Sequence, residues 1–462
     1  MSTGAPHPTP DPPVTGEHRL SAGTIARYAV GSLGTGGFAT LPGLVLTYYL
    51  TDNLGVAAAF AGVVITIAKL WDVIIDPVIG ALTDRQRALT GSRRGYMLIG
   101  ACSLPFLFAL TFAVPPGLAP VVGAIWVLIA FTATATAFSL FQVPYIALPA
   151  ELTPGYDERT RLLTWRVIVL TFAILLFGAG GPILRDLTGD PTSGYLLMGA
   201  VSGVTIGVGM LISSTVAARG VRQASRPDAA RLDVRAHYVE GIRALRRSQP
   251  FRALLLTYVL QALATGLMLA GAQYLATWVM HSEAAVTLLF ASLIAPALIA
   301  APVWGVIARR IGKTRAFRLA STLFIVAALV ISGAVIAPGD WLYAPVALAG
   351  IAYAGMQSLP MAMLPDVISA DGTASAGAFS GVWTAGETVG FAISASAFTA
   401  VLALTGYISS TADMSVTQPD SAVAGIVIAF SVIPAVLTLL SLVSLSRYRL
   451  TKHDIDAATP AA

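Results

Sequence analysis

Three carboxylates and one lysine interrupt an apolar stretch, KLWDVIIDPVIGALTDR, at residues 69 to 85. On a helix, Asp72, Asp76 and Asp84 recur at multiples of four residues and lie along one stripe, with Lys69 at its border. Two carboxylates one turn apart repel each other when both are ionised, and a bound cation or a retained proton relieves that repulsion. Asp72 and Asp76 are therefore candidate ligands for H⁺ or for Na⁺, a hard ion that suits oxygen ligands.

A structural interpretation of the same stripe stays open at this stage. Lys69 can pair with Asp72, and hydrogen bonds from neighbouring helices can satisfy Asp76. Asp84 comes last in the stripe, next to Arg85, and we expect these two residues to pack or to form part of a gate. A carboxylate that faces lipid costs several kcal/mol, so in either interpretation the stripe faces the protein interior or a water-filled cavity.

The composition places these charges in a membrane protein. Of the 462 residues, 56% are hydrophobic and 11% are charged, and the mean hydropathy is +0.77, whereas soluble domains carry about 25% charged residues. The single cysteine, Cys102, excludes an internal disulfide and any multi-cysteine metal site. The sequence contains no Walker motif and no HExxH motif. We therefore expect no enzymatic activity and no cofactor beyond a coupling cation.

Twelve apolar runs are long enough to cross a bilayer, which takes about 20 helical residues. They are predicted over residues 24–51, 55–84, 96–115, 119–148, 161–184, 194–218, 251–280, 284–308, 316–337, 342–367, 373–406 and 420–446. We therefore predict an all-α membrane protein with two pseudo-symmetric six-helix bundles, at 24–218 and 251–447. The polar loop 219–250 between them can form an amphipathic surface helix or serve as a plain connector. Segments 1–23 and 448–462 are predicted to be a disordered N-terminus and a tail.

Basic residues gather on one side of the predicted membrane. The side that holds both termini carries every Lys and Arg cluster of the loops, whereas the opposite side has only Arg185 and many carboxylates. Cytoplasmic loops carry the excess of Lys and Arg, so both termini are predicted to be cytoplasmic in a multi-pass protein of the bacterial cytoplasmic membrane. The net charge of +5 follows from this bias, and we expect no nucleic-acid partner.

Two sequence features recur in the two halves. GALTDRQRALTGSRRG at the end of span 2 matches GVIARRIGKTRAFR at the end of span 8, because each has Gly, three residues, a charged residue and Arg before a basic turn. PYIALPAEL in span 4 matches PMAMLPDVI in span 10. Corresponding features in corresponding spans indicate a duplicated six-helix unit. The acids that close the second pair, Glu151 and Asp366, suit a cytoplasmic salt-bridge gate.

This duplicated pattern resembles the major facilitator superfamily. WDVIIDPVIG resembles the span-2 motif of the glycoside–pentoside–hexuronide:cation symporters, and PYIALPAELTPGYDERTRLLTWR, residues 144 to 166, resembles that family's span 4–5 junction. The resemblance implies secondary transport of a small solute with a cation by alternating access. It also implies that Asp72 and Asp76 bind the cation and that Arg166 lies near the substrate. Arg166 can equally well extend its side chain to the cytoplasmic interface.

The chain departs from the family's sugar symporters at four positions. Their aspartates in spans 1 and 4 align with Gly36 and Gln142, the polar residue before their second span-2 aspartate is Ile75, and a span-11 lysine aligns loosely with Glu387. A galactoside pocket built on two carboxylates is thus absent, and the case for Na⁺ over H⁺ is weakened. Ser139, one turn before Gln142, still offers a hydroxyl to the cation.

Several other polar side chains fall within the predicted spans. Glu387 has no basic neighbour in its span, so we expect it to be protonated, partnered across the halves, or in contact with the solute. The other candidates for the lining of a solute cavity are Gln142, Tyr145, Gln261, Gln273, Gln357 and Trp383. Each of these can instead make a helix–helix hydrogen bond.

Together these features predict a monomeric symporter whose partners are the bilayer, a small organic solute and Na⁺ or H⁺. A sugar or glycoside is the favoured solute. Two alternatives remain. One is a proton-driven exporter, or a carrier of a lipid-like or other non-sugar solute, on the same fold. The other is a membrane sensor that transports nothing.

Overall fold

The structure is a computed structural model that describes residues 19–153, 156–217, 243, 245–371, 376–412 and 416–450. Within these residues, twelve helical segments are long and apolar enough to cross a membrane. The predicted all-α membrane fold is therefore confirmed. Most of the two predicted terminal segments and most of the central loop lie outside the described residues, so the domain limits there stay predictions, although the first helix already begins at Ala22, inside the segment predicted to be disordered.

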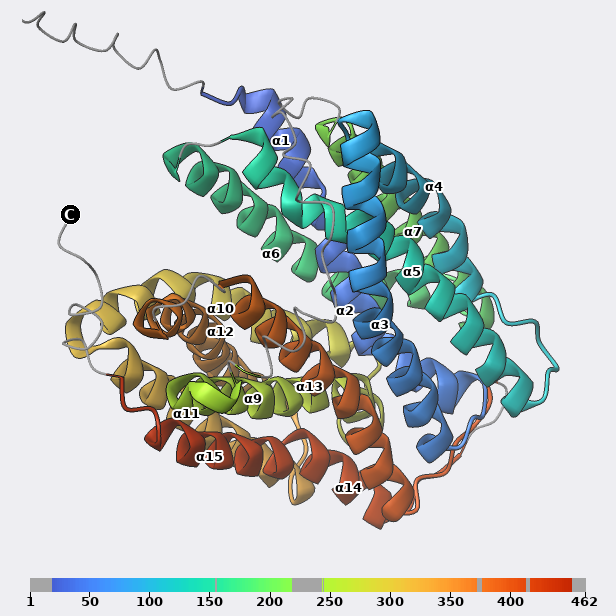
Figure 1. The fold of residues 1–462 in the computed structure, drawn as a ribbon. Helices are drawn as coiled ribbons and strands as arrows, with labels where there is room; N and C mark the ends of the chain where they lie inside the picture. Colours follow the sequence, from blue (N-terminus) through green and yellow to red (C-terminus); the bar gives the residue numbers. More distant parts are fainter. Residues whose placement is uncertain are drawn as a thin grey trace, which may run out of the picture.

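The first six spans form one bundle, coloured blue to green in Figure 1. The first span joins three elements, α1 (Ala22–Val30), α2 (Ser32–Tyr48) and a π-helical turn η1 (Tyr49–Asn53). The other five are α3 (Ala58–Thr90), α4 (Arg94–Thr111), α5 (Pro120–Leu152), α6 (Tyr156–Asp186) and α7 (Pro191–Ser214). Helix α3 ends at Gly91, whose positive φ of 74° favours glycine and stops the helix.

The last six spans form the second bundle, coloured green to red in Figure 1. Its first three are α9 (Gln249–Tyr274) with a π-helical turn η4 (Leu275–Val279), α10 (Ala285–Ile311), and α11 (Lys313–Ile331) with a 3₁₀ turn η5 (Ser332–Val335). The remaining three are α12 (Tyr343–Asp371), preceded by the 3₁₀ turn η6 (Asp340–Leu342), then α13 (Ala376–Leu404), and α14 (Asp420–Phe430) continued by α15 (Val432–Ser446).

The two bundles repeat details that go beyond helix count. A π-helical turn closes the first span of each bundle, at η1 and at η4. Two prolines five residues apart lie inside the fourth span of each, Pro144 and Pro149 in α5 and Pro360 and Pro365 in α12. These matches agree with the duplicated unit that the sequence indicates.

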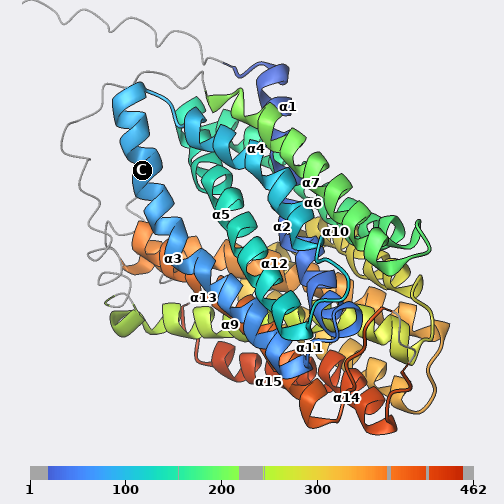
Figure 2. The same ribbon diagram turned by 90° about the vertical axis from the view of Figure 1, so that its right-hand side faces the viewer.

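The two bundles make a V (Figures 1 and 2). They are apart at the end where α1 begins and α15 ends, here called the wide end, and together at the opposite, narrow end. Three helix pairs join them, α3 with α13, α6 with α10, and α2 with α9. The bundles are therefore in contact at the narrow end and diverge toward the wide end.

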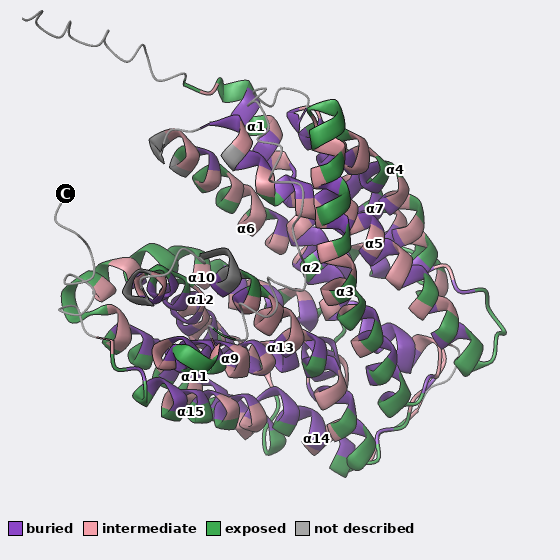
Figure 3. Ribbon diagram, in the orientation of Figure 1, coloured by how far each residue is buried: buried purple, intermediate pink, exposed green. Residues whose placement is uncertain are grey.

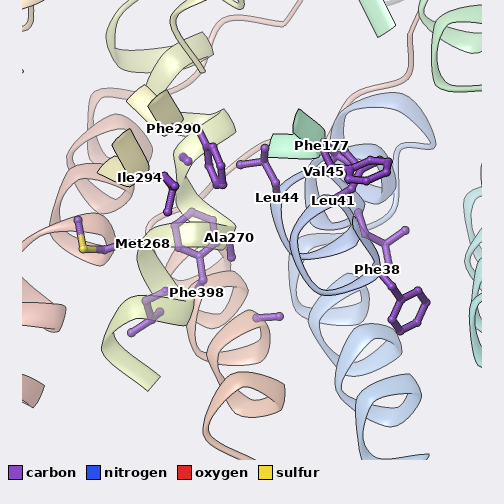
Figure 4. Packing of buried hydrophobic residues seen from close by; sticks show 14 of the residues in the cluster. Phe38, Leu41, Leu44, Val45, Phe177, Met268, Ala270, Phe290, Ile294 and Phe398 are labelled. Atoms are coloured by element: carbon purple, nitrogen blue, oxygen red, sulfur yellow. The ribbon is translucent and has the colours of Figure 1, made fainter. Parts of the chain in front are cut away.

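Small residues allow the bundles to touch. A Cβ on Gly62 of α3 would lie 1.9 Å from the Thr399 hydroxyl of α13, and one on Gly178 of α6 would lie 2.0 Å from the Phe290 ring of α10. Figure 4 shows Leu44 of α2 facing Phe290 of α10 across the junction between the bundles. Close packing of this kind holds membrane helices together, because lipid supplies no hydrophobic drive for their association.

Exposed residues lie along the outward faces of the helices (Figure 3), and many of them are large and apolar, as a lipid environment requires. On α3, for example, Ile74 is 63% and Ile67 is 50% exposed. The aspartates Asp72 and Asp76 lie on a different face of the same helix. Because α3 offers apolar side chains to the outside, its carboxylates are turned toward the interior of the protein.

Candidate functional site

A cavity of about 490 Å³ lies between the two bundles. Side chains from α2, α3, α5 and α6 line it on one side, and side chains from α9 to α13 line it on the other. Seven of the residues that the sequence singles out are among its lining, namely Lys69, Asp72, Asp76, Ser139, Gln142, Gln357 and Glu387. A solute in this cavity would touch both halves of the protein at once.

Asp72 and Asp76 project into the cavity from α3. One carboxylate oxygen of each, Oδ1, is buried and has no hydrogen-bond partner among the described residues. The Ser139 hydroxyl on α5 faces Asp76. Two carboxylates and a hydroxyl are hard oxygen donors, so this set fits H⁺ or Na⁺. In the part of the chain that the structure describes, no third acid, His or Cys joins them in a cluster.

Lys69 does not neutralise either aspartate through an ion pair in the described structure. Its ammonium group instead lies 5.4 Å from the centroid of the Phe38 ring and 5.5 Å from that of Phe131, which is a cation–π arrangement. The fixed Lys69–Asp72 pair of the structural interpretation is therefore not formed. The carboxylate of Asp72 is left available to a mobile cation.

The polar lining on α5 reaches across to α2. Thr35 donates a hydrogen bond of 2.8 Å to the Gln142 side-chain oxygen, and this amide lies where the family's sugar symporters have an aspartate. At Gly36 a Cβ would lie 2.7 Å from the Ala173 Cβ and 3.0 Å from the Leu170 carbonyl oxygen on α6. The close packing of α2 on α6 explains why no side chain occupies that position.

Two predicted substrate residues of the first bundle lie outside the cavity lining. Tyr145 is fully buried, and its hydroxyl donates to the Tyr28 carbonyl oxygen and contacts the Ser32 hydroxyl, both at 3.0 Å. The Arg166 guanidinium lies over the Tyr145 ring, 5.5 Å from its centroid. The structure thus brings these two residues together within the first bundle and separates them from the other candidates.

The amide candidates of α9 make hydrogen bonds away from the cavity, Gln261 to other helices and Gln273 within its own span. Gln261 donates to the Ser321 and Ser441 hydroxyls at 2.9 and 3.0 Å, and Gln273 donates to Thr277 at 3.1 Å. Neither lines the cavity. For Gln261 in particular, the helix–helix hydrogen bond that the sequence left as an alternative is what the structure contains.

Around Glu387 the structure adds a residue that sequence reasoning missed. The Tyr258 hydroxyl of α9 lies 2.7 Å from Glu387 Oε1 on α13 and 2.9 Å from Gln357 Oε1 on α12. Trp383 is 2% exposed and stacks on the Tyr258 ring with 4.4 Å between centroids, behind the cavity wall. The sequence around Tyr258 does not indicate that its hydroxyl bonds cavity residues, because its partners come from two other helices.

At the wide end, the predicted gate acids pair within their own bundles. Glu151 is bound by Arg93 at 2.8 Å and by Arg87 at 3.1 Å, while Asp366 is bound by Lys313 at 2.6 Å. In both bundles a basic residue at the start of the third span thus forms an ion pair with an acidic residue near the end of the fourth span. No ion pair of the described residues joins the bundles at this end, in agreement with its open shape.

Arg93 also forms an ion pair with Asp84, the last carboxylate of the α3 stripe. Asp84 therefore pairs with Arg93 and not with Arg85, the exposed residue that follows it in the sequence. The Arg93 side chain is 9% exposed and additionally donates to Thr83 at 3.1 Å. It therefore connects the end of α3, the start of α4 and the end of α5.

Replacing Arg93 by alanine should lower the free energy of unfolding by about 3 kcal/mol, because the buried Glu151 carboxylate loses its main partner. Size-exclusion chromatography of purified protein after heating over a temperature series would measure the loss. Arg85→Ala removes an exposed arginine from the same turn and should leave the profile unchanged. Equal profiles for both variants would contradict the structural role of Arg93.

At the narrow end, the bundles are joined through Asp52 and Glu283, which are among the carboxylates on the side opposite the termini, and through residues that the sequence analysis did not single out. The Asp52 carboxylate, at 9% exposure, accepts hydrogen bonds of 2.5 Å from Thr51 and from Tyr407 of the second bundle. Backbone hydrogen bonds also cross, from Ser410 N–H to the Thr51 carbonyl at 2.9 Å. An ion pair of 3.3 Å adds Arg185 of α6 and Glu283, which precedes α10. We call the set around Asp52, Thr51, Tyr407 and Ser410 the narrow-end latch.

Solved structures with this arrangement of helices are transporters. The nucleoside transporter NupG matches with a TM-score of 0.65 at 12% identity, over 91% of this chain and 99% of that one. The xylose transporter XylE from E. coli in its inward-open conformation matches with a TM-score of 0.63 at 14% identity, over 94% and 98%. At these identities the likeness concerns the fold.

Several sequence relatives are named as symporters. The inner membrane symporter YicJ of Escherichia coli is 22% identical over 89% of this chain and 88% of its own length. An uncharacterized symporter of Synechocystis sp. is 37% identical over 36% of this chain, and the match spans 30% of that protein. A putative sulfoquinovose importer of Salmonella typhimurium is 27% identical over 40% of each chain. The matches to these last two cover less than half of their length.

The family model described as MFS/sugar transport protein matches residues 27–452, almost the whole helical part of the chain. This match, the symporter relatives and the cavity between two six-helix bundles agree with the motif resemblance in spans 2 and 4. The chain therefore belongs to the MFS/sugar transport protein family and is a secondary transporter of the glycoside–pentoside–hexuronide:cation symporter type.

Proposed function

We propose that this protein couples the import of a sugar or glycoside to Na⁺ or H⁺ across the bacterial cytoplasmic membrane. One observation carries the proposal. Asp72 and Asp76 have buried, unpartnered carboxylate oxygens in the cavity that both bundles line. Carboxylates inside a membrane protein mark ion or substrate pathways, because their burial is otherwise unfavourable.

Coupling between cation and solute follows from their common cavity. A cation on Asp72 and Asp76 removes the repulsion between the two carboxylates and changes the local charge beside the solute. If the cation raises the affinity for the solute, the solute raises the affinity for the cation by the same factor. The lining comes from both bundles, so the arrangement of the bundles that is favoured with solute and cation bound differs from the arrangement favoured when the cavity is empty. Alternating access requires such a difference.

The composition of the cavity supports a sugar-like solute. Aromatic rings such as Phe38, Phe131 and Phe138 offer apolar surface, while Gln142 and Gln357 offer hydrogen bonds. A pyranose presents both kinds of surface, and small-molecule sites combine them in this way. Among the described residues of the lining, Lys69 is the one basic side chain. It would suit an acidic sugar, which is the type named for the putative sulfoquinovose importers and the glucuronide carrier homolog among the relatives.

The direction of opening depends on the topology. The charge bias of the loops predicts cytoplasmic termini, and α1 begins and α15 ends at the wide end. On this topology the cavity opens to the cytoplasm and the narrow-end latch closes the outer side. Right-side-out vesicles test the direction of transport, since solute accumulation under an inward cation gradient supports import and cation-driven depletion supports the exporter.

A thermal-shift screen of purified protein tests solute and ion together. Neutral sugars, glycosides, acidic sugars and organic acids would each be added with and without Na⁺ at two pH values. A ligand present at 100 times its dissociation constant stabilises the folded state by about 2.7 kcal/mol, and we expect that stabilisation to be larger with the coupling cation. A solute response that is identical with and without Na⁺ and at both pH values would contradict cation coupling.

A further inference from the structure

Three side chains from three helices of the second bundle form a chain of hydrogen bonds at the cavity wall. The Tyr258 oxygen lies 2.7 Å from Glu387 Oε1 and 2.9 Å from Gln357 Oε1. Glu387 and Gln357 line the cavity, whereas Tyr258 is 2% exposed and lies behind them. The stacked Trp383 ring, inclined by 20°, holds the phenol in place. The position of the phenol oxygen between two acceptors is thus fixed by packing.

A count of protons distinguishes two states of this chain. A phenol has one proton and can donate to one of the two facing oxygens. In the observed arrangement, both hydrogen bonds can form only when Glu387 carries a proton. Glu387 then donates to the Tyr258 oxygen, and Tyr258 donates to Gln357 Oε1. If Glu387 is ionised, Tyr258 must donate to it, and the Gln357 amide must rotate to bring its NH₂ group to the phenol oxygen.

The charges around Glu387 favour its neutral form. From α3, the groups Lys69, Asp72 and Asp76 line the same cavity. Tyr258 on α9 and Tyr353 on α12 are the titratable groups beside it in the second bundle, and the one acid of α14, Asp420, is its first residue. Among the described residues, none forms an ion pair with Glu387. A carboxylate without a counterion is strongly disfavoured inside a membrane protein.

We propose that Glu387 is a second coupling residue, a proton carrier in the C-terminal bundle that acts separately from the Asp72 and Asp76 pair. A proton from water in the cavity binds the carboxylate and forms an O–H bond, and no other bond changes. Its arrival turns the Tyr258 proton toward Gln357 and leaves the Gln357 NH₂ group free to face the solute, while its departure leaves the amide oxygen to do so. The binding of the proton stands on the geometry alone, and only its effect on the solute rests on the proposed function.

Infrared difference spectroscopy detects this proton without any solute. Full-length protein in liposomes would be taken from low to high pH, and the C=O stretching band of protonated carboxylic acids followed. We expect this band to contain a component that Glu387→Gln removes and that the double variant Asp72→Asn, Asp76→Asn retains. Glu283→Gln, which changes a 58% exposed carboxyl near the narrow end, serves as the control and should leave the band in place.

Two further variants test the hydrogen-bond chain. Tyr258→Phe keeps the ring that stacks on Trp383 but removes the acceptor of the Glu387 proton, so the band should remain and move in frequency. Gln357→Leu removes the acceptor of the Tyr258 proton, which then turns to Glu387. The ratio of protonated to ionised Glu387 at a given pH should fall about tenfold, the equivalent of one hydrogen bond. A band that persists unchanged in Glu387→Gln, or that ignores both variants, would overturn the proposal.

The same spectra separate this inference from the proposed function. Loss of the band in the aspartate double variant would assign the proton to α3 and overturn the role of Glu387, while leaving cation coupling intact. A band that depends on Glu387 in a protein whose solute binding ignores all cations would retain the proton site and remove symport. The two proposals thus fail on different measurements.

Discussion

Asp72→Asn and Asp76→Asn, made together, should abolish the dependence of solute binding on the cation and leave the protein folded. Asparagine has the shape of aspartate and keeps one carbonyl oxygen, but it carries no charge and takes up no proton. Coupling energies between two ligands in one protein correspond to affinity ratios on the order of 5- to 150-fold. The double variant should lose that ratio and bind the solute with a single, low affinity in every buffer.

The measurement is the solute-induced thermal shift with and without Na⁺ at two pH values, followed by uptake into vesicles under a cation gradient. Asp84→Asn is a matched control, because it removes the third carboxylate of the same stripe, whose partner is Arg93 at the wide end. We expect it to retain the cation response. If the double variant responds to cations as the wild type does, the aspartates are structural. If its solute binding is unaltered in every respect, the non-transporting sensor gains support.

The fold could be predicted from the sequence because the bilayer restricts the choices. Every backbone polar group in a membrane must be satisfied within the segment, so a long apolar run is a helix. The ends of helices follow other rules. The apolar run predicts a membrane span over 55–84, whereas helix α3 continues to Thr90 as a polar helix outside that run, until Gly91 ends it. Hydropathy marks the membrane limit, whereas a capping residue marks the limit of the helix.

The candidate site could be predicted where several polar residues share one helix face. The four-residue spacing of Asp72 and Asp76 fixed their common orientation, and the apolar remainder of α3 turned both inward. A single residue carries no such information. Gln142 and Tyr145 are both polar residues of α5 and only three positions apart, yet Gln142 lines the cavity and Tyr145 is sealed in the first bundle.

Residues whose roles depend on contacts between helices escaped the sequence analysis. Tyr258 meets Glu387 and Gln357 through packing that no local pattern records. Asp52 follows the first apolar run and reads as a loop acid, because the sequence does not reveal that the π-helical turn η1 carries it into the contact with Tyr407. The roles of both residues can be predicted only from the tertiary arrangement of helices that are distant along the chain.

Replacing Asp52 by alanine should shift the protein toward a state in which the narrow end is open. In the closed state the variant leaves the buried Tyr407 hydroxyl without its acceptor, whereas the Thr51 hydroxyl keeps the Thr47 carbonyl oxygen and the Tyr274 hydroxyl as partners. An unsatisfied buried hydroxyl is destabilising by about 1–3 kcal/mol. In the open state water reaches the Tyr407 hydroxyl, so this destabilisation applies to the closed state alone. A shift of about 2 kcal/mol changes the ratio of the two states roughly 30-fold.

Thiol labelling reports this shift. Cys102 is the only cysteine, so Cys102→Ser gives a background in which Thr265→Cys places one thiol in the cavity lining. A membrane-impermeant maleimide added from the side of the narrow end should label this thiol slowly in the latch-intact protein and much faster with Asp52→Ala. Asp190→Asn is the matched control at the same end, since Asp190 caps the start of α7 by accepting from Ser193 N–H at 2.9 Å and does not join the bundles. Equal labelling rates with and without the Asp52 carboxylate would exclude the latch.

Variants of the narrow-end latch and variants of Asp72 and Asp76 should have different effects on transport. Asp52→Ala biases which side of the cavity is open but leaves Asp72, Asp76 and the cavity lining untouched, so solute binding should remain cation-dependent while net transport slows. The aspartate double variant should do the reverse, retaining slow labelling from the narrow end and losing the cation response. Because the latch residues hold the bundles together and the aspartates hold the ion, a variant of either set that reproduced both effects would mean that gating and ion binding use the same groups.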